Sequence, residues 1–219
     1  MMNDLITTDE QVLSYSGPVQ SQRTINYNPI FPILTCEVEL DLPLDLINAD
    51  ALKLAGEAKN YEGGFTTFYD RPEIEKITHM NGLRQSIYSV AVHYANEADY
   101  QLNLDKCSVD LWVNVMKKGG YHPPHIHPRS TFSGTFYSLV SEATSPLILI
   151  NPTNPFRMHD PQPKQNKQSP FSAENYVLQP RQGYLYLWPS WIEHFVPEMG
   201  VEEDRISFSF NIDFLPIGA

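Results

Sequence analysis

The sequence predicts a mainly β domain of the α+β class, with its helices confined to the N-terminal half. Two observations support this prediction. Apolar residues recur at helical spacing only before residue 100, as at Leu83, Ile87 and Ala91, which would form one face of an amphipathic helix. From Cys107 to Phe214 the pattern changes to short alternating or apolar runs, which are typical of β-strands.

We expect the chain to form one domain over residues 1–219. Single β-barrels and sandwiches commonly reach this length, and neither an internal repeat nor a linker divides the sequence. Within this domain, residues 1–106 would supply a strand and helices that support a β core at residues 107–214.

The N-terminal half is expected to hold three elements after a polar arm at residues 1–29. Residues 33–40 alternate between apolar and polar side chains, which indicates a half-buried strand. Residues 46–59 consist of good helix formers and are followed by a Gly-Gly pair, so they predict a first helix. Residues 81–97 predict the second, amphipathic helix.

Strands account for most of the C-terminal half. Their predicted ranges are 109–115, 131–139, 147–150, 176–180, 184–188, 193–196 and 205–214. The connection at residues 151–170 is rich in Pro, Asn and Gln. Connections this long inside a compact domain are commonly lids or mobile segments, and the sequence leaves both roles open.

The strand predicted at residues 205–214 has two different faces. Its even-numbered residues, from Ile206 to Phe214, are apolar, whereas its odd-numbered residues, from Arg205 to Asp213, are polar. The two helices upstream need an apolar sheet face to cover. We therefore expect the polar face to line an interior site rather than to meet water.

Composition excludes several classes of partner. The net charge is −11 with only 15 Lys and Arg residues, so the chain lacks the basic surface that nucleic acid or anionic lipid requires. Cys36 and Cys107 are expected to be free thiols in a reducing compartment. No signal peptide and no run of 18 apolar residues is present. These features predict a cytoplasmic protein that binds neither nucleic acid nor membrane, and an exposed strand edge would allow a homodimer.

A cluster of histidines is the strongest chemical signal. His122, His125 and His127 lie within six residues of one another. Residues i and i+2 of a strand share a face, so His125 and His127 are expected to point at one metal ion. His194 is the third candidate ligand, and the three can meet only if the sheet curls into a barrel. Imidazole binds several transition metals, so these residues alone do not select one, and His122 remains an alternative to one of the pair.

Arg205 and Ser207 supply a second signal, eleven residues after His194. A buried arginine needs an anionic partner, and its planar guanidinium matches a carboxylate through two hydrogen bonds. Ser207 would project to the same face. A dicarboxylate could therefore bind the metal at one end and Arg205 and Ser207 at the other.

These residues belong to a longer pattern that resembles the 2-oxoglutarate- and Fe(II)-dependent oxygenases, in particular a small bacterial and phage group. The pattern covers about residues 107–214 and comprises Trp112-x-Asn114, Gly120, His125-Ile-His127-Pro128, Ser133-Gly134, Tyr137, Gly183, Trp188-Pro189-Ser190-Trp191, His194, Arg205-Ile-Ser207 and Asn211. The resemblance implies a double-stranded β-helix (jelly-roll) core with the N-terminal helices packed on its outer face.

The resemblance also implies an enzyme, a non-haem iron dioxygenase that hydroxylates its substrate with O2 and converts 2-oxoglutarate to succinate and CO2. It implies Fe(II) at His125, His127 and His194, and 2-oxoglutarate between the iron and Arg205. Further expected contacts of the cosubstrate are Ser207, Tyr137 and Asn114, and expected pocket residues are His122, Trp112 and Asn211. The prime substrate would be a small molecule or a protein side chain.

One position departs from the family pattern. His127 stands where the usual triad of two histidines and a carboxylate has Asp or Glu. Three neutral histidines also suit Zn²⁺ with an open water position. The alternatives are therefore a cupin-like three-histidine enzyme (a cosubstrate-free dioxygenase, an isomerase or a hydrolase) and a non-catalytic metal-binding barrel. The cupin-like alternative leaves Arg205 and Ser207 unexplained.

Overall fold

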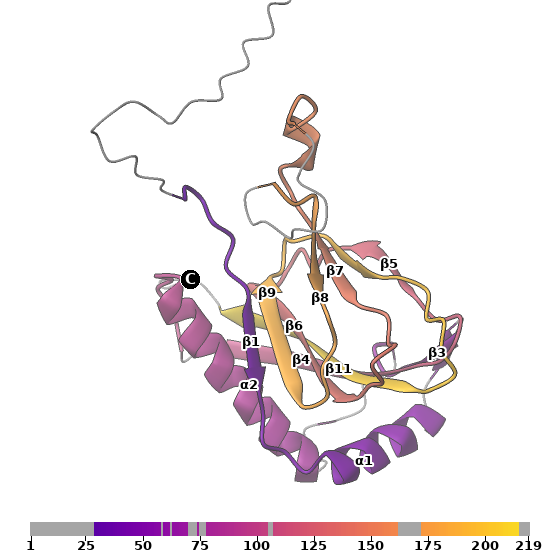
Figure 1. Cartoon of the computed structure of the whole chain (residues 1–219). Helices are drawn as coiled ribbons and strands as arrows, with labels where there is room; N and C mark the ends of the chain where they lie inside the picture. Colours follow the sequence, from indigo (N-terminus) through magenta and orange to yellow (C-terminus); the bar gives the residue numbers. More distant parts are fainter. Residues whose placement is uncertain are drawn as a thin grey trace, which may run out of the picture. The chain divides into compact units, whose positions relative to one another are not determined.

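Figure 1 shows the computed structural model of the chain, which describes residues 29–57, 59–61, 63–69, 74, 78–104, 107–161 and 172–214. The chain forms two compact units, Met1–Ile33 and Leu34–Ala219. Of the first unit only residues 29–33 are described, so the arm expected at residues 1–29 lies almost wholly outside the described residues. A single domain over residues 1–219 stays a prediction. All elements below belong to the second unit.

Two antiparallel sheets form the core of this unit. The larger sheet has the order β1 (Cys36–Glu39), β9 (Tyr184–Pro189), β6 (Phe132–Leu139), β11 (Arg205–Phe214), β4 (Cys107–Met116), β3 (Gly64–Thr66) and β2 (Lys59–Tyr61). The smaller sheet has the order β5 (His122–His125), β10 (His194–Val196), β7 (Leu147–Ile150) and β8 (Asn175–Leu178). From β4 onward the chain crosses repeatedly between the two sheets, which is the arrangement of a double-stranded β-helix.

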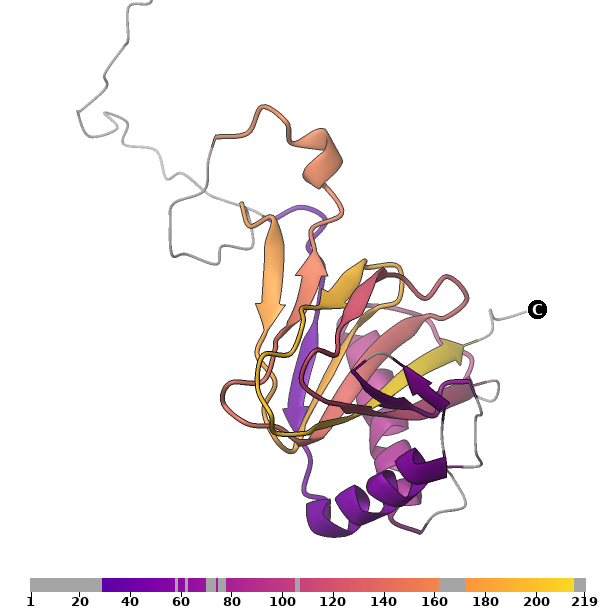
Figure 2. The same ribbon diagram turned by 90° about the vertical axis from the view of Figure 1, so that its right-hand side faces the viewer.

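Two helices, α1 (Leu44–Glu57) and α2 (Thr78–Glu97), cover one face of the larger sheet, and the smaller sheet lies on its other side (Figures 1 and 2). Both helices bury an apolar stripe: Ile47 and Ala51 of α1 and Leu83 and Ile87 of α2 are fully buried. They belong to one apolar cluster with the sheet residues Val113, Val115, Phe132, Phe136, Leu185, Leu187, Ile206, Phe208, Phe210 and Ile212. The predicted helices on the outer face are thereby confirmed.

The central strand β11 separates this core from the site. Its even-numbered residues from Ile206 to Ile212 are 0% exposed and pack under the helices. Its odd-numbered residues Arg205, Ser207 and Ser209 instead line a cavity on the opposite face. The expectation that the polar face lines an interior site is thus confirmed for Arg205, Ser207 and Ser209, because side chains alternate strictly along a strand, whereas Asn211 and Asp213 do not line the cavity.

The element boundaries follow the sequence patterns closely, with three additions. The strands at 147–150 and 205–214 have their predicted limits, and both helices begin two or three residues earlier than predicted. The β2–β3 hairpin, the strand β5 and a 3-10 helix, η2 (Asn154–Phe156), were not predicted. Strand β5 has the sequence His-Pro-Pro-His; its prolines cannot donate to a ladder, so it is confined to a sheet edge and gives no strand signal.

The long connection at residues 151–170 is described only at residues 151–161, which extend beyond the ends of β7 and β8 (Figure 2). None of these residues lines the cavity; residues 162–170 of the predicted loop lie outside the described residues. Among the described helices, none is long and apolar enough to cross a membrane.

Gly134 in β6 offers a test of the sheet packing. A methyl group at this position would overlap the ring of Phe210 on β11 and would lie 2.5 Å from the carbonyl oxygen of Tyr186 on β9. Because one of these obstacles is backbone, Gly134→Ala should lower the free energy of unfolding by about 1–3 kcal/mol in a denaturant titration. The control is Gly200→Ala, where a Cβ would meet nothing within 4 Å. Equal unfolding free energies for the two variants would contradict this packing.

Candidate metal centre and anion-binding cavity

A cavity of about 320 Å³ lies between the two sheets. The larger sheet contributes residues of β3, β4, β6, β9 and β11, and the smaller sheet contributes residues of β5, β7 and β10. Of the predicted site residues, the following line this cavity: Trp112, Asn114, His122, His125, His127, Tyr137, His194, Arg205 and Ser207. Asn211 does not line it and lies behind His127, as described below.

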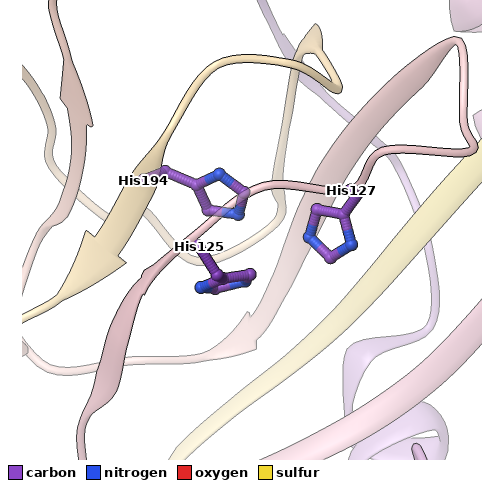
Figure 3. Close-up of side chains that lie close together, drawn as sticks. All are labelled: His125, His127 and His194. Carbon is purple, nitrogen blue, oxygen red and sulfur yellow. The ribbon is translucent and has the colours of Figure 1, made fainter.

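Three of these residues, His125, His127 and His194, converge on one point (Figure 3). Each can offer a ring nitrogen, and these nitrogens lie within 4.8 Å of one another. His194 begins β10 and pairs in register with His125, the last residue of β5. Their ring centroids are 4.3 Å apart, and that of His127 lies 5.0 Å from His125 and 5.2 Å from His194. Three imidazoles so placed suit a divalent transition metal.

The structure corrects the reason given for His127. Strand β5 ends at His125, so the two residues do not share a strand face. His127 lies in the turn that follows, where its backbone N–H donates to the carbonyl of Ser190 at 3.0 Å. The predicted cluster is present, but a contact with the β9–β10 connection holds its second member. Glu193, beside His194, is exposed and is no ligand to this cluster.

Hydrogen bonds fix the rings of two of these histidines. His125 Nδ1 lies 2.7 Å from the carbonyl oxygen of Pro123, and His194 Nδ1 lies 2.9 Å from that of Ile192. A carbonyl oxygen only accepts, so each Nδ1 carries the proton and each Nε2 keeps its lone pair. This is the tautomer that binds a metal through Nε2.

The cavity also favours the neutral form of the rings. Burial, and then the neighbouring His125, lowers the pKa of His127 to about 4. Burial, followed by His125, lowers the pKa of His194 to about 3. Neutral imidazole is the form that coordinates a metal, so both rings are ready to bind near pH 7.

Behind His127 a line of polar side chains leads away from the cavity. Asn211 Nδ2 lies 3.2 Å from His127 Nδ1, and Asn211 Oδ1 lies 2.8 Å from Ser133 Oγ. Ser133 Oγ lies in turn 2.9 Å from Ser190 Oγ. Asn211 therefore touches a cluster member instead of lining the cavity.

Arg205 is the one buried guanidinium in the described part of the chain, with 2% of its surface exposed. Its Nη2 donates to the Tyr137 hydroxyl at 3.0 Å, and its Nη1 donates to Ser207 Oγ at 3.5 Å. Its Nε is buried and has no hydrogen-bond partner. None of the ion pairs found among the described residues includes Arg205. A buried cation held only by neutral groups is costly unless an anion joins it.

The remaining predicted residues have different environments. Asn114 accepts from Thr66 Oγ1 at 2.8 Å and donates to Ser209 Oγ at 3.0 Å, so protein groups already engage both ends of its amide. Burial, then Arg205 and His125, lowers the pKa of His122 to about 3. Trp112 packs beside His127 with ring centroids 6.0 Å apart.

Sequence reasoning missed two polar groups of the cavity wall. Thr135 Oγ1 and Trp188 Nε1 are buried without hydrogen-bond partners, and both residues line the cavity. Thr135 could have been found, because it lies between Ser133 and Tyr137 on the inward face of β6. The hairpin residues Thr66, Phe68 and Tyr69 gave no signal, because their place at the cavity depends on the pairing of β3 with distant β4.

Comparison with known proteins agrees with this geometry. Residues 110–211 match the family model described as "Putative 2OG-Fe(II) oxygenase". No curated protein matches the sequence.

Several solved structures share the fold. A prolyl-4-hydroxylase from Pseudomonas putida aligns with a TM-score of 0.55 and 13% identity over 83% of this chain and 93% of that one. A prolyl hydroxylase from Trichoplax adhaerens, in complex with a hypoxia-inducible-factor peptide fragment, aligns with a TM-score of 0.55 and 13% identity over 82% and 83%. The epimerase SnoN of nogalamycin biosynthesis, solved with Fe3+ and α-ketoglutarate, aligns with a TM-score of 0.55 and 11% identity over 86% and 84%. These likenesses confirm the double-stranded β-helix.

The histidine cluster predicts tight binding of a single divalent ion. Under anaerobic conditions the protein should bind Fe(II), and His194→Ala should weaken that binding by roughly 100-fold or more, since changes even behind the ligands cost up to that much. The control is His93→Ala, which removes an exposed histidine of α2 that is not part of the cluster. Calorimetric titration measures both affinities. If His194→Ala and His93→Ala lose Fe(II) affinity equally, or if neither loses any, the histidine cluster is not the metal site.

Proposed function

We propose that His125, His127 and His194 hold Fe(II) and that Arg205 binds the far carboxylate of 2-oxoglutarate. The match of residues 110–211 to the 2-oxoglutarate- and Fe(II)-dependent oxygenase model supports this proposal. The single observation that carries this proposal is the buried, unpaired guanidinium in the same cavity as the three histidines. When bound, the iron would provide the chemistry with O2. The protein's own residues bind, orient and desolvate the reactants.

The three histidines fit a ferrous ion, but the net charge of the resulting metal site would differ from that of the usual site. Family members usually place a carboxylate where this chain has His127, which removes one positive charge from the metal. Three neutral imidazoles leave the full charge of the ion in the cavity. An anionic cosubstrate then supplies the missing negative charge, so metal and 2-oxoglutarate support each other's binding.

Arg205 fits the other end of 2-oxoglutarate. The free N–H at Nε, next to Nη2, presents the side of the guanidinium fork that a carboxylate can meet with two hydrogen bonds. Nη2 carries two N–H groups, so its bond to the Tyr137 hydroxyl leaves one for the carboxylate, and Nη1 donates to Ser207 Oγ. These two bonds fix the plane of the fork. Tyr137 also packs its ring against the guanidinium, 4.9 Å from Cζ to the ring centroid. We assign Tyr137 and Ser207 as residues that orient Arg205.

Two more donors complete a cavity suited to an anion. Thr135 Oγ1 and Trp188 Nε1 are buried and unpartnered, and among the described residues none that lines the cavity is Asp or Glu. In a chain of net charge −11, this site is cationic once metal is present. Charge complementarity of this kind favours the entry of a dicarboxylate.

For the prime substrate we propose an uncharged group of a protein side chain or of a small molecule, hydroxylated at carbon. The lining residues Phe68, Tyr69, Trp112 and Tyr121 give the cavity an aromatic portion, and Tyr69 is 67% exposed. The described part of the lining holds no carboxylate that could pair with a cationic substrate. The structure from Trichoplax adhaerens shows that this fold accepts a peptide. We propose neither nucleic acid nor a membrane as a partner. A homodimer remains part of the proposal. So does a cytoplasmic location, with which the free thiols of Cys36 and Cys107 are compatible.

A cupin-like three-histidine enzyme that needs no 2-oxoglutarate is the less well supported alternative. It would use the same histidines, but it gives no reason for a buried arginine without an anionic partner. A non-catalytic metal-binding barrel has the same weakness. The family match over residues 110–211 favours the oxygenase over both.

The proposal is tested by anaerobic titration of the Fe(II)-loaded protein with 2-oxoglutarate, followed by the visible metal-to-ligand charge-transfer band. Arg205→Ala should weaken 2-oxoglutarate binding by about 100-fold, because a buried hydrogen-bonded ion pair loses one partner. Arg129→Ala, which removes an exposed arginine outside the cavity lining, is the matched control and should bind normally.

Two results would overturn the proposal. If the iron-loaded wild type shows no saturable band, the protein does not bind 2-oxoglutarate at its metal. If the band is present but Arg205→Ala titrates like Arg129→Ala, the far carboxylate is held elsewhere.

A further inference from the structure

We propose that Asn211 is a positioning residue that sets the tautomer of His127. In this proposal the amide oxygen of Asn211 accepts a hydrogen bond from His127 Nδ1–H, which leaves Nε2 unprotonated and aimed at the metal. The inference rests on the proposed function only in so far as His127 is a metal ligand. A carboxylate ligand needs no such partner, but a histidine ligand must have its proton on the ring nitrogen that faces away from the metal.

An imidazole has two nitrogens, and only one of them can face the ion. For His125 and His194 the backbone sets which one, because a carbonyl two residues earlier in the chain accepts from Nδ1–H. Among the described residues, no backbone carbonyl oxygen accepts from the ring of His127. Its Nδ1 instead faces the amide of Asn211, at 3.2 Å, and an amide can either donate or accept.

The line of side chains behind His127 can carry its hydrogen bonds in two directions. In the inward direction, Ser190 donates to Ser133, Ser133 donates to Asn211 Oδ1, and Asn211 Nδ2 donates to His127 Nδ1. The ring proton then sits on Nε2 and faces the cavity. In the outward direction, His127 Nδ1–H donates to Asn211 Oδ1, Asn211 Nδ2 donates to Ser133 Oγ, and Ser133 donates to Ser190 Oγ.

Both directions use the same contacts between heavy atoms. A half-turn of the Asn211 amide exchanges its oxygen and nitrogen and preserves the distances of 3.2 Å to His127 and 2.8 Å to Ser133. Ser133 and Ser190 are both 1% exposed, so water does not compete for this line. The hydroxyl of Ser133 can follow either direction, because it donates one bond and accepts others.

Metal binding selects the outward direction. A protonated Nε2 cannot coordinate an ion, so inward bonding would remove His127 from the ligand set. Outward bonding gives all three histidines the same tautomer, with Nδ1–H bonded to an oxygen and Nε2 free. Asn211 thus does for His127, from strand β11 and 84 residues away, what the local backbone does for the other two.

Two substitutions at Asn211 separate this role from simple packing. Asn211→Asp keeps an acceptor for Nδ1–H and removes the donor, so zinc affinity should stay within about threefold of the wild type or rise. Asn211→Leu removes the acceptor, and zinc affinity should fall about 10- to 100-fold, as it does when partners of metal-bound histidines are removed. Asp213→Asn is the control: it changes the same face of β11 two residues along, where Asp213 accepts from Thr131, and should bind zinc normally.

The tautomer is read directly from nitrogen-15 NMR of the zinc-loaded protein, with His127→Gln used to assign the His127 ring. The expected result is a proton on His127 Nδ1 in the wild type and in Asn211→Asp. A proton on His127 Nε2, or zinc affinity lost in Asn211→Asp as fully as in Asn211→Leu, would overturn the inference. Denaturant unfolding of each variant shows that loss of affinity is not loss of the fold. This test uses zinc and no 2-oxoglutarate, whereas the test of the proposed function needs both iron and 2-oxoglutarate. Either proposal can therefore fail while the other holds.

Discussion

The buried charge of Arg205 is the constraint on which this site depends. Protein groups accept hydrogen bonds from two of its nitrogens, and its Nε is buried without a partner in a residue that lines the cavity. An isolated buried guanidinium costs several kcal/mol, so the strand register that carries it inward is maintained in spite of that cost. The structure is explained if an anion completes the site, and the three-histidine cluster in the same cavity indicates which anion: one with a second group that binds metal.

The two-sheet architecture makes this arrangement possible. The larger sheet supplies Arg205 and its supports, the smaller sheet supplies His125 and His194, and the helices seal the outer face of the larger sheet. The cavity therefore has a polar wall backed by an apolar core. In the proposed site, His127 in place of the usual carboxylate raises the charge of the metal centre by one. The described lining residues include no Asp or Glu, which is consistent with a site that takes its negative charge from 2-oxoglutarate.

The sequence was informative where local pattern and spacing carry the answer. Alternation predicted the strand 205–214 and the inward-facing Arg205 and Ser207. The members of the histidine cluster were also predicted, although His127 joins it from the turn after β5 and not through a shared strand face. The sequence was uninformative where position depends on partners distant in the chain. Strand β5 contains two prolines and is recognisable only through its pairing with β10. The place of Asn211 behind His127 depends on a contact across 84 residues, so the pattern could mark it as a pocket residue but could not reveal its function.

The most direct test of the central claim is a crystal structure of the protein with Fe(II) and 2-oxoglutarate, grown without oxygen, with the metal located by anomalous scattering. The account predicts one ion bound by His125, His127 and His194, with 2-oxoglutarate chelated to it and its far carboxylate on the Nε side of Arg205. An ion that excludes His127, or a cosubstrate whose far carboxylate lies away from Arg205, would contradict the account.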